Sequence, residues 1–172
     1  ADAVLVATDE DAQYLNRLCR RAHLPKTVVP NPIDTEQFSP LPDSPRNMRR
    51  ILYVGRLSPE KNVPLLLEAC RQLPDVTVEI VGDGELRPRL EAMADTKRVV
   101  FRGVIPNQEL NKLYAEAGIF VLPSVFEGNP KALLEAMSCG AAAVATRTGV
   151  FPTLIEDGQT GYVVDVGDVG DQ

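Results

Sequence analysis

Short apolar runs alternate with amphipathic stretches along most of the chain. Runs of this kind, bounded by glycine, proline and polar residues, are typical of buried strands. Between most of them, apolar residues recur three and four positions apart, which is the spacing of one helix face. The predicted strands after residue 50 are Ile51–Val54, Val76–Val81, Val99–Phe101, Ile119–Leu122, Ala142–Ala145 and Tyr162–Val164. Strands that alternate with helices predict an α/β fold, with a parallel sheet and helices on both of its faces.

Two amphipathic stretches carry the clearest helical pattern. Asn107–Ala117 has the apolar stripe Leu110, Leu113, Tyr114 and Ala117, and Asn62–Leu73 has the stripe Val63, Leu66, Leu67 and Cys70. Both stripes follow the i, i+3, i+4, i+7 spacing of a helix that packs one face against a core. The sequence therefore predicts a helix in each stretch.

The first 50 residues have a different organisation. Ala3–Thr8 and Lys26–Val29 predict short strands on either side of a helix over Asp9–Ala22. Residues 30–49 then hold five of the 14 prolines, which favour extended backbone over regular elements. We therefore predict three parts: residues 1–29, a Pro-rich linker over residues 30–49, and an α/β domain over residues 50–172.

The composition is that of a soluble globular chain. Of the 172 residues, 44% are apolar and 24% are charged, and the length suits about one domain. The formal net charge is −6 and neither half of the chain is net basic, which argues against nucleic-acid binding through clustered Lys and Arg. The apolar runs are far shorter than the ~20 residues of a membrane span, and the first residues resemble no secretory signal. The sequence therefore predicts a cytoplasmic protein.

Potential metal ligands are few. Cys19, Cys70 and Cys139 are odd in number and far apart, no CxxC pattern occurs, and His23 is the one histidine. These features predict neither a disulfide framework nor a zinc site, and they favour a reducing compartment. Asp9–Asp11 matches a DxD metal pattern, but acidic residues at a helix start are explained by the helix dipole alone. We therefore expect no metal.

The unusual residues fall where the predicted strands end. These segments are Gly55–Asn62 (GRLSPEKN), Gly82–Glu85 (GDGE), Arg102–Val104 (RGV), Pro123–Met137 (PSVFEGNPKALLEAM) and Thr146–Val150 (TRTGV). In open α/β sheets, ligands bind outside the carboxyl ends of the strands. The segments therefore predict one ligand-binding crevice.

Arg56 and Lys61 lie in the first of these segments. A guanidinium can hold two phosphate oxygens at once, and an ammonium adds a compact point charge. The pair therefore indicates an anion site, although two solvated cations in a surface loop explain the same residues.

A further helix is predicted within Glu127–Gly140. Asn129 suits its N-cap, Pro130 its first turn and Gly140 its end. Its N-terminus would open into the crevice, where free N–H groups and the positive end of the dipole attract an anion.

Two carboxylates flank the start of this helix. Glu127 lies in the loop before it, and Glu135 follows eight residues later. Glu135 is expected on the helix face away from Leu133, Ala136 and Met137. The simpler interpretation is that Glu127 stabilises the helix N-terminus and that Glu135 is an exposed helix glutamate. A glycoside hydrolase could use both carboxylates, but it would leave the two cations and the helix N-terminus without a purpose.

Other phosphate and nucleophile motifs are incomplete. Gly82-Asp83-Gly84 follows a strand, but Arg87 replaces the third glycine of a GxGxxG fingerprint. A GxxxxGK[ST] loop is absent, and no Ser-His-Asp or Cys-His set can be assembled from one histidine.

Four segments together resemble the donor-binding half of glycosyltransferase family 4, whose members are retaining enzymes of the GT-B fold. They are GRLSPEKN, VEIVGDGELR, FVLPS and FEGNPKALLEAMSCG, and VVPNPIDTEQFSP resembles the interdomain segment of that family. The resemblance covers about residues 1–165. It implies a Rossmann-like parallel sheet with helices on both faces, as the C-terminal half of a GT-B fold. It also implies that residues 1–29 end an N-terminal acceptor domain and that residues 50–172 form the donor-binding domain.

The resemblance also implies roles for the candidate residues. Arg56 and Lys61 would hold the diphosphate of a nucleotide sugar, helped by backbone amides around Lys131–Leu133. Glu135 would accept hydrogen bonds from the ribose, Glu127 would contact the transferred sugar, and backbone near Val104 would face the base. The implied catalytic residues are Glu127, Arg56 and Lys61. The implied donor-binding residues are Gly55, Arg56, Lys61, Val104, Glu127, Lys131, Ala132, Leu133 and Glu135.

By this resemblance the donor is UDP- or GDP-linked, and no cofactor or metal is needed. The acceptor, whether a glycan, a lipid or a small molecule, would bind a missing N-terminal domain, and a full-length protein could associate with membranes. The chain departs from the family at Pro32, Val150 and Thr153, and it lacks the usual C-terminal helical segment. We therefore expect it to bind donor but to transfer sugar poorly. The alternatives are a noncatalytic nucleotide-sugar-binding module and a GT-B epimerase or phosphorylase.

Overall fold

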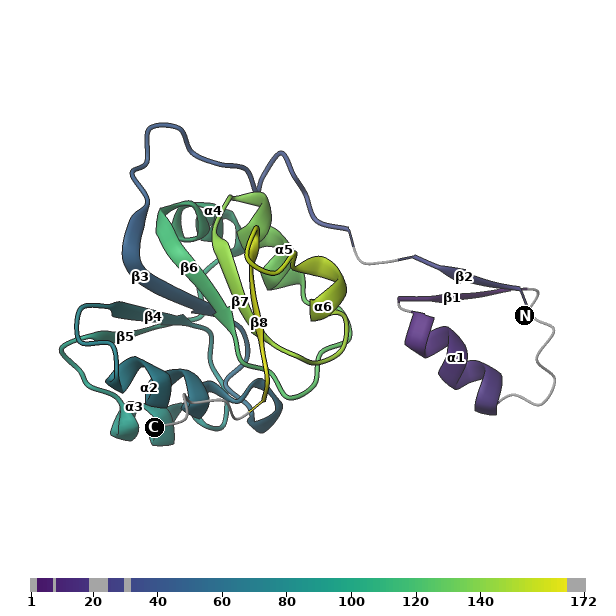
Figure 1. Ribbon diagram of the computed structural model, residues 1–172, viewed down its shortest axis with the longest axis horizontal. Coiled ribbons are helices and arrows are strands. Elements are labelled where there is room, and N and C mark those ends of the chain that lie inside the picture. Colours follow the sequence, from purple (N-terminus) through teal and green to yellow (C-terminus); the bar gives the residue numbers. More distant parts are fainter. Residues whose placement is uncertain (1–2, 8, 19–24, 30–31, 167–172) are drawn as a thin grey trace.

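A computed structural model describes residues 3–7, 9–18, 25–29 and 32–166. The main body is a six-stranded parallel sheet (Figure 1). Its strands are β3 (Asn47–Val54), β4 (Thr77–Val81), β5 (Val99–Gly103), β6 (Ala117–Leu122), β7 (Ala142–Thr146) and β8 (Gly161–Val164). Every strand predicted after residue 50 overlaps one of these, so the predicted parallel sheet is confirmed.

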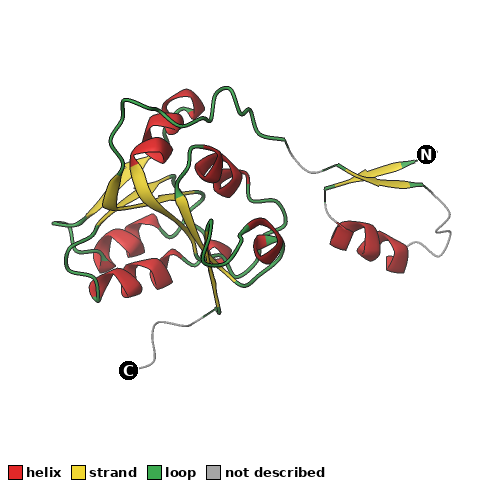
Figure 2. Ribbon diagram, turned by 45° about the horizontal axis from the view of Figure 1, so that its top comes forward, coloured by secondary structure: helices red, strands yellow, loops and turns green. Residues whose placement is uncertain are grey.

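Helices cover both faces of this sheet, as predicted (Figures 1 and 2). On one face lie α2 (Val63–Arg71) and α3 (Arg87–Met93), and on the other lie α4 (Asn107–Glu116) and α5 (Lys131–Ser138). A 3-10 turn, η1 (Pro59–Lys61), precedes α2. The short helix α6 (Phe151–Leu154) was not predicted, because four residues are too few to show a helical period.

The strand order creates the predicted crevice. The order across the sheet is β5-β4-β3-β6-β7-β8. The chain therefore moves outward from β3 to β5 and then returns to place β6 on the other side of β3. The loops after β3 and β6 leave the sheet in opposite directions, and ligands of doubly wound sheets bind between such loops.

An aromatic cluster joins the Pro-rich segment to the helices above the sheet. Tyr114 of α4 is fully buried, and its ring meets those of Phe38 and Phe120 edge-on, at centroid distances of 5.8 and 5.7 Å. Phe38 comes from the predicted linker and is only 2% exposed. Ser138 of α5 donates a hydrogen bond to the carbonyl of Phe38 at 2.6 Å. The linker therefore forms part of the core of this domain.

The Pro-rich segment has neither helix nor strand from residue 32 to residue 46, as predicted. However, β3 begins at Asn47, four residues before the predicted start at Ile51 and inside the predicted linker. Its first residues are polar apart from an exposed Met48, so no apolar run marks them, although Asn47 pairs with Ala117 of β6. The division into domains remains a prediction.

A smaller unit precedes the linker. Parallel strands β1 (Val4–Val6) and β2 (Lys26–Val28) flank α1 (Asp9–Leu18). The two predicted strands are confirmed, and the helix is confirmed from its predicted start to Leu18. Its predicted end, residues 19–22, lies outside the described residues. None of the described helices is both long and apolar enough to span a bilayer.

Candidate functional site

The loop after β3 and the loop after β6 are joined directly. The backbone N–H of Val125 donates to the carbonyl of Glu60 at 2.9 Å. The ammonium of Lys61 forms an ion pair with the Oε2 carboxylate oxygen of Glu127. The side chains of Lys61 and Glu127 are 20% and 12% exposed, so the ion pair is largely shielded from solvent. It lies in the loops that follow β3 and β6, the two central strands of the sheet. The structure thus brings together two of the residues predicted for the site.

The loop that carries Glu127 also accepts hydrogen bonds from the end of β7 and from the loop after it. The hydroxyl of Thr146 donates to the carbonyl of Ser124, and that of Thr148 donates to the carbonyl of Val125 at 3.1 Å. Gly149 adopts a φ of +49°, and a Cβ there would lie 1.9 Å from the carbonyl oxygen of Glu127. Only glycine allows this contact, so Gly149 helps to set the position of Glu127.

A pocket of ≈ 270 Å³ opens beside the first loop. Gly55, Arg56 and Val104 line it, and the side chains of Arg56 and Val104 are exposed. Gly82 also lines it with a φ of +127°, and a Cβ there would lie 1.9 Å from the carbonyl oxygen of Gly55. The pocket therefore depends on the close approach of two backbones, and three of the predicted binding residues share it.

Tyr53 supports this loop from inside the core. Its side chain is fully buried, and its hydroxyl donates to the carbonyl of Arg56 at 2.8 Å. Burial, helped by the negative charges of Glu127 and Glu60, raises the pKa of Tyr53 far above its usual range. The phenol therefore stays protonated and remains a hydrogen-bond donor at any physiological pH. The sequence did not identify Tyr53 as a site residue, because the pattern around an aromatic residue in a buried strand predicts only that it is part of the core.

The start of α5 differs from the prediction. Pro130, not Asn129, is the N-cap, and no side chain caps the helix. The amide of Lys131 donates to the carbonyl of Asn129 at 3.1 Å, and that of Leu133 to Pro130 at 3.0 Å. The expected free amides are therefore already bonded at these two residues. The helix dipole and the exposed side chain of Lys131 remain to attract an anion.

The interpretation of Glu135 as an exposed helix glutamate is wrong. Its side chain is buried with only 6% exposure, and its Oε2 atom accepts a hydrogen bond from the Tyr114 hydroxyl at 3.0 Å. Burial raises the pKa of Glu135, while this hydrogen bond and the charge of Lys131 act in the opposite direction. Helical spacing alone did not predict the burial of Glu135, because α5 packs against both the sheet and α4. More than one face of this helix is therefore buried.

Metal ligands do not gather in the described residues: no three His, Cys, Asp or Glu side chains lie together in that part of the chain. Asp9 begins α1, as the helix-dipole explanation of the DxD pattern requires. Cys70 and Cys139 are buried free thiols. Cys19 and His23 lie outside the described residues.

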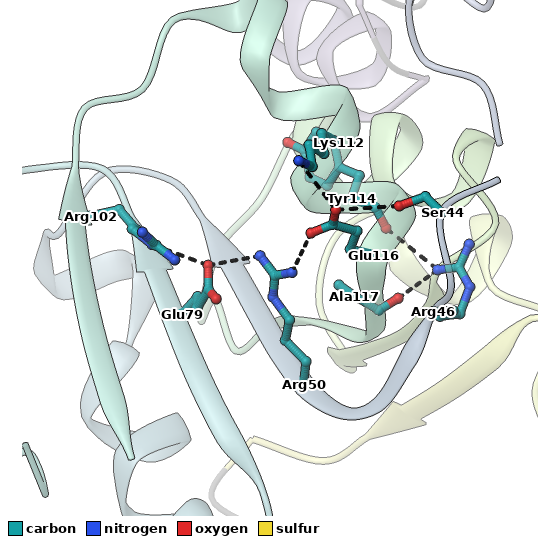
Figure 3. Close-up of polar contacts among 9 residues, drawn as sticks. All are labelled: Ser44, Arg46, Arg50, Glu79, Arg102, Lys112, Tyr114, Glu116 and Ala117. Atoms are coloured by element: carbon teal, nitrogen blue, oxygen red, sulfur yellow. Dashed lines mark hydrogen bonds and ion pairs between the residues drawn. The ribbon is translucent and has the colours of Figure 1, made fainter. Parts of the chain in front are cut away.

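A second charged region lies on the α4 face of the sheet (Figure 3), and Ile105 lines both this region and the pocket beside Arg56. We call the charged region the ion-pair groove. It encloses ≈ 580 Å³, more than twice the volume of the pocket beside Arg56. Its side chains form an alternating chain of ion pairs in the order Arg102, Glu79, Arg50, Glu116, Lys112. The sequence analysis did not predict this groove, because its members come from four separate elements.

Comparison with known proteins gives the family. The family of group 1 glycosyl transferases matches residues 48–172. A GDP-mannose-dependent phosphatidylinositol monomannoside mannosyltransferase of Mycolicibacterium smegmatis is 34% identical over 165 residues, which cover 82% of this chain and 43% of that protein.

Two solved structures have the same fold. Sucrose-phosphate synthase of Thermosynechococcus elongatus superposes with a TM-score of 0.83 at 28% identity, over 98% of this chain and 46% of that one. The HepE protein of Anabaena in complex with UDP-glucose superposes with a TM-score of 0.80 at 25% identity, over 97% of this chain and 50% of that one. The chain therefore spans about half of these relatives, or less. With its parallel Rossmann-like sheet, it belongs to the group 1 glycosyl transferases, within the GT-B glycosyltransferases.

Proposed function

We propose that the crevice between the loops after β3 and β6 binds a nucleoside-diphosphate sugar, and that this chain is the donor-binding half of a retaining glycosyltransferase. The observation that carries this proposal is that the loop of Arg56 and Lys61 meets the loop of Glu127, through the Lys61–Glu127 ion pair, at the point where the strand order reverses. Cations at such a point suit an anionic ligand, because the carboxyl ends of the strands leave room for it there.

Each part of the donor has a counterpart in the site. Arg56 and Lys61 bind the diphosphate, together with the positive end of α5. The pocket of Gly55 and Val104 takes the base, and Glu135 accepts hydrogen bonds from the ribose hydroxyls. Glu127, which already orients Lys61, contacts the sugar that is transferred.

The chemistry needs stabilisation of the leaving group. The bond between the anomeric carbon and the diphosphate oxygen breaks, and its electron pair leaves with the nucleoside diphosphate. The acceptor oxygen bonds to the anomeric carbon on the same face, and its proton passes to the departing diphosphate oxygen. Negative charge grows on the diphosphate during this step, so fixed cations beside it lower the barrier. These cations belong to the protein, and we therefore propose that the reaction needs no metal.

The named relatives support a nucleotide donor without fixing its base. The mannosyltransferase depends on GDP-mannose, whereas the HepE structure holds UDP-glucose. Both donors share a ribose and a diphosphate, which are the groups that Arg56, Lys61 and Glu135 would bind. The acceptor, and any membrane association, would depend on parts of a longer protein.

Calorimetric titration of the chain with UDP, GDP, ADP and NAD tests the proposal. We expect saturable binding of one nucleoside diphosphate, with the same affinity in EDTA as in Mg²⁺, and weaker binding by Arg56→Ala and Glu135→Ala. Lys112→Ala is a matched control, since Lys112 is an exposed cation of the ion-pair groove. A folded chain that binds none of the four nucleotides would contradict the proposal.

A further inference from the structure

The ring of Tyr114 is packed on two sides by other aromatic rings. It is fully buried on α4 and lies between the rings of Phe38 and Phe120, which it meets at interplanar angles of 71° and 67°. A ring held on two sides places its hydroxyl in one position. That hydroxyl points at Glu135 of the neighbouring helix α5, 3.0 Å from Oε2.

In the described part of the chain, the ionisable groups near Glu135 come from α4, from α5 and its C-cap, and from the segment before β3. Lys131 and Cys139 face Glu135 from its own helix, and Tyr114 faces it from α4. Arg46, from the segment before β3, lies beside the Cys139 thiol and donates to the carbonyl of Cys139 at 2.7 Å. The Tyr114 hydroxyl is therefore the group that offsets the burial of this carboxylate through a direct hydrogen bond.

We propose that Tyr114 is a positioning residue for the donor nucleotide, whose hydroxyl holds the Glu135 carboxyl turned so that its second oxygen can accept the ribose hydroxyls. The inference rests on the proposed function of this crevice. It adds a residue that does not touch the donor and that acts through another side chain.

The physical reason is the cost of burying a carboxylate. Burial favours the protonated acid, and a hydrogen bond to the charged form opposes that effect. A protonated carboxyl has an O–H donor in place of one acceptor site, so it binds two ribose hydroxyls less well. Without the Tyr114 hydroxyl, the pKa of Glu135 rises further and the carboxyl also gains rotational freedom. Donor binding then weakens most where the acid is protonated, at low pH.

The test compares the dissociation constants of the nucleoside diphosphate for Tyr114→Phe and for wild type across the range of about pH 5.5 to about pH 8.5. The ratio of the two constants cancels the titration of the nucleotide's own phosphates. We expect the variant to bind about 10-fold more weakly at the acid end, as one pKa unit implies, and to recover toward wild type at the alkaline end. A ratio that is constant across the range would overturn the inference.

Two further variants separate positioning from general damage. In the Glu135→Gln background nothing titrates at this place, so adding Tyr114→Phe must leave the ratio flat with pH. Tyr53→Phe is a matched control, because it removes a buried hydroxyl whose partner is the backbone carbonyl of Arg56. We expect it to change affinity by the same factor at every pH. Pyrophosphate, which has no ribose, should bind Tyr114→Phe and wild type equally.

A measurement on the unmodified chain does not depend on whether any variant folds. The carboxyl carbon of Glu135 can be followed by NMR through a pH titration, with and without nucleotide. We expect its midpoint to fall when nucleotide binds, because ribose hydroxyls favour the charged form. An unchanged midpoint in a chain that binds nucleotide would refute the contact of Glu135 with the ribose, and the inference with it, while leaving the proposed binding of the diphosphate standing. Absence of nucleotide binding by wild type would instead refute the proposed function.

Discussion

Two charged regions lie on the same sheet, and they differ in how much of their charge is already paired. In the ion-pair groove, Arg50 lies between Glu79 and Glu116, at 2.9 and 2.7 Å from their carboxylate oxygens (Figure 3). All three side chains are largely buried. In the crevice, Lys61 is paired with Glu127, but Arg56 is exposed and lines an open pocket. Paired charge holds elements together, whereas charge left open at a strand-order reversal is available for a ligand.

Volume alone would favour the ion-pair groove as the binding site. The ion-pair groove is the larger hollow, but its cations face carboxylates of this same chain. Arg50 joins β3 to β4 and to the end of α4, so its role is to fix these elements. The comparison predicts that changes in the groove alter folding stability and that changes in the crevice alter nucleotide binding.

The largest effect on stability is expected from Arg50→Met. Loss of the Arg50 guanidinium leaves Glu79 and Glu116 partly buried without their shared cation. Breaking a buried ion pair lowers the free energy of unfolding by about 3 kcal/mol. Urea unfolding measures this loss. Nucleotide affinity of the folded variant should equal that of wild type. A loss of affinity without a loss of stability would erase the distinction between the two regions.

Arg56→Ala should give the converse result. Its exposed side chain contributes little to folding, so the free energy of unfolding should change by less than about 0.5 kcal/mol. Loss of a charged hydrogen-bond donor to the diphosphate should weaken nucleotide binding by about 2 kcal/mol, which is roughly 30-fold. Calorimetry and urea unfolding of the same preparation measure both quantities. Stability loss with unchanged binding would place Arg56 with the structural cations.

Acid should weaken the ion-pair groove. Hydrogen bonding to Arg50 is the main cause that lowers the pKa of Glu116. A carboxyl with a depressed folded pKa stabilises the fold above its unfolded pKa, and this contribution is lost as the pH falls through the folded pKa. The stability difference between wild type and Arg50→Met should therefore shrink below the ordinary Glu pKa of about 4.3. Unfolding curves at several acid pH values test this, and a constant difference would argue against the ion pair as its source.

Lys112→Ala should have the smallest effect. Lys112 is 73% exposed and lies 3.7 Å from Glu116, so solvent screens the pair. Exposed pairs of this kind contribute less than about 0.5 kcal/mol. Urea unfolding of this variant and of Arg50→Met compares the two free energies of unfolding. The difference shows how far burial, rather than the number of charges, sets the contribution of the ion pairs to stability. Equal losses in the two variants would contradict that view.

The predictable part of the molecule follows from local pattern. Strand and helix periodicity predicted the parallel sheet, and the placement of Lys61 and Glu127 after strands predicted that they would meet near the crevice. Contacts between distant segments were not predictable in this way. Phe38 lies in a proline-rich stretch without period, yet it packs on Tyr114 of α4.

The hydrogen bonds of buried polar side chains could not be predicted from the sequence either. Glu135 reads as an ordinary helix glutamate until α4 places a tyrosine hydroxyl against it. Tyr53 reads as core for a similar reason, because its hydroxyl bonds to a backbone carbonyl that no pattern reveals. Both tyrosines point from the core toward predicted binding residues, and only the packed structure shows their direction.

Amide hydrogen exchange, with and without a saturating nucleoside diphosphate, tests the central claim most directly. The account predicts slower exchange within residues 55–61 and 124–134, where the loops after β3 and β6 and the start of α5 would contact the ligand. It predicts no change in residues 77–81, which form β4 beneath the ion-pair groove. Protection confined to β4 and α4 would contradict the account and would move the ligand to the larger, internally paired groove.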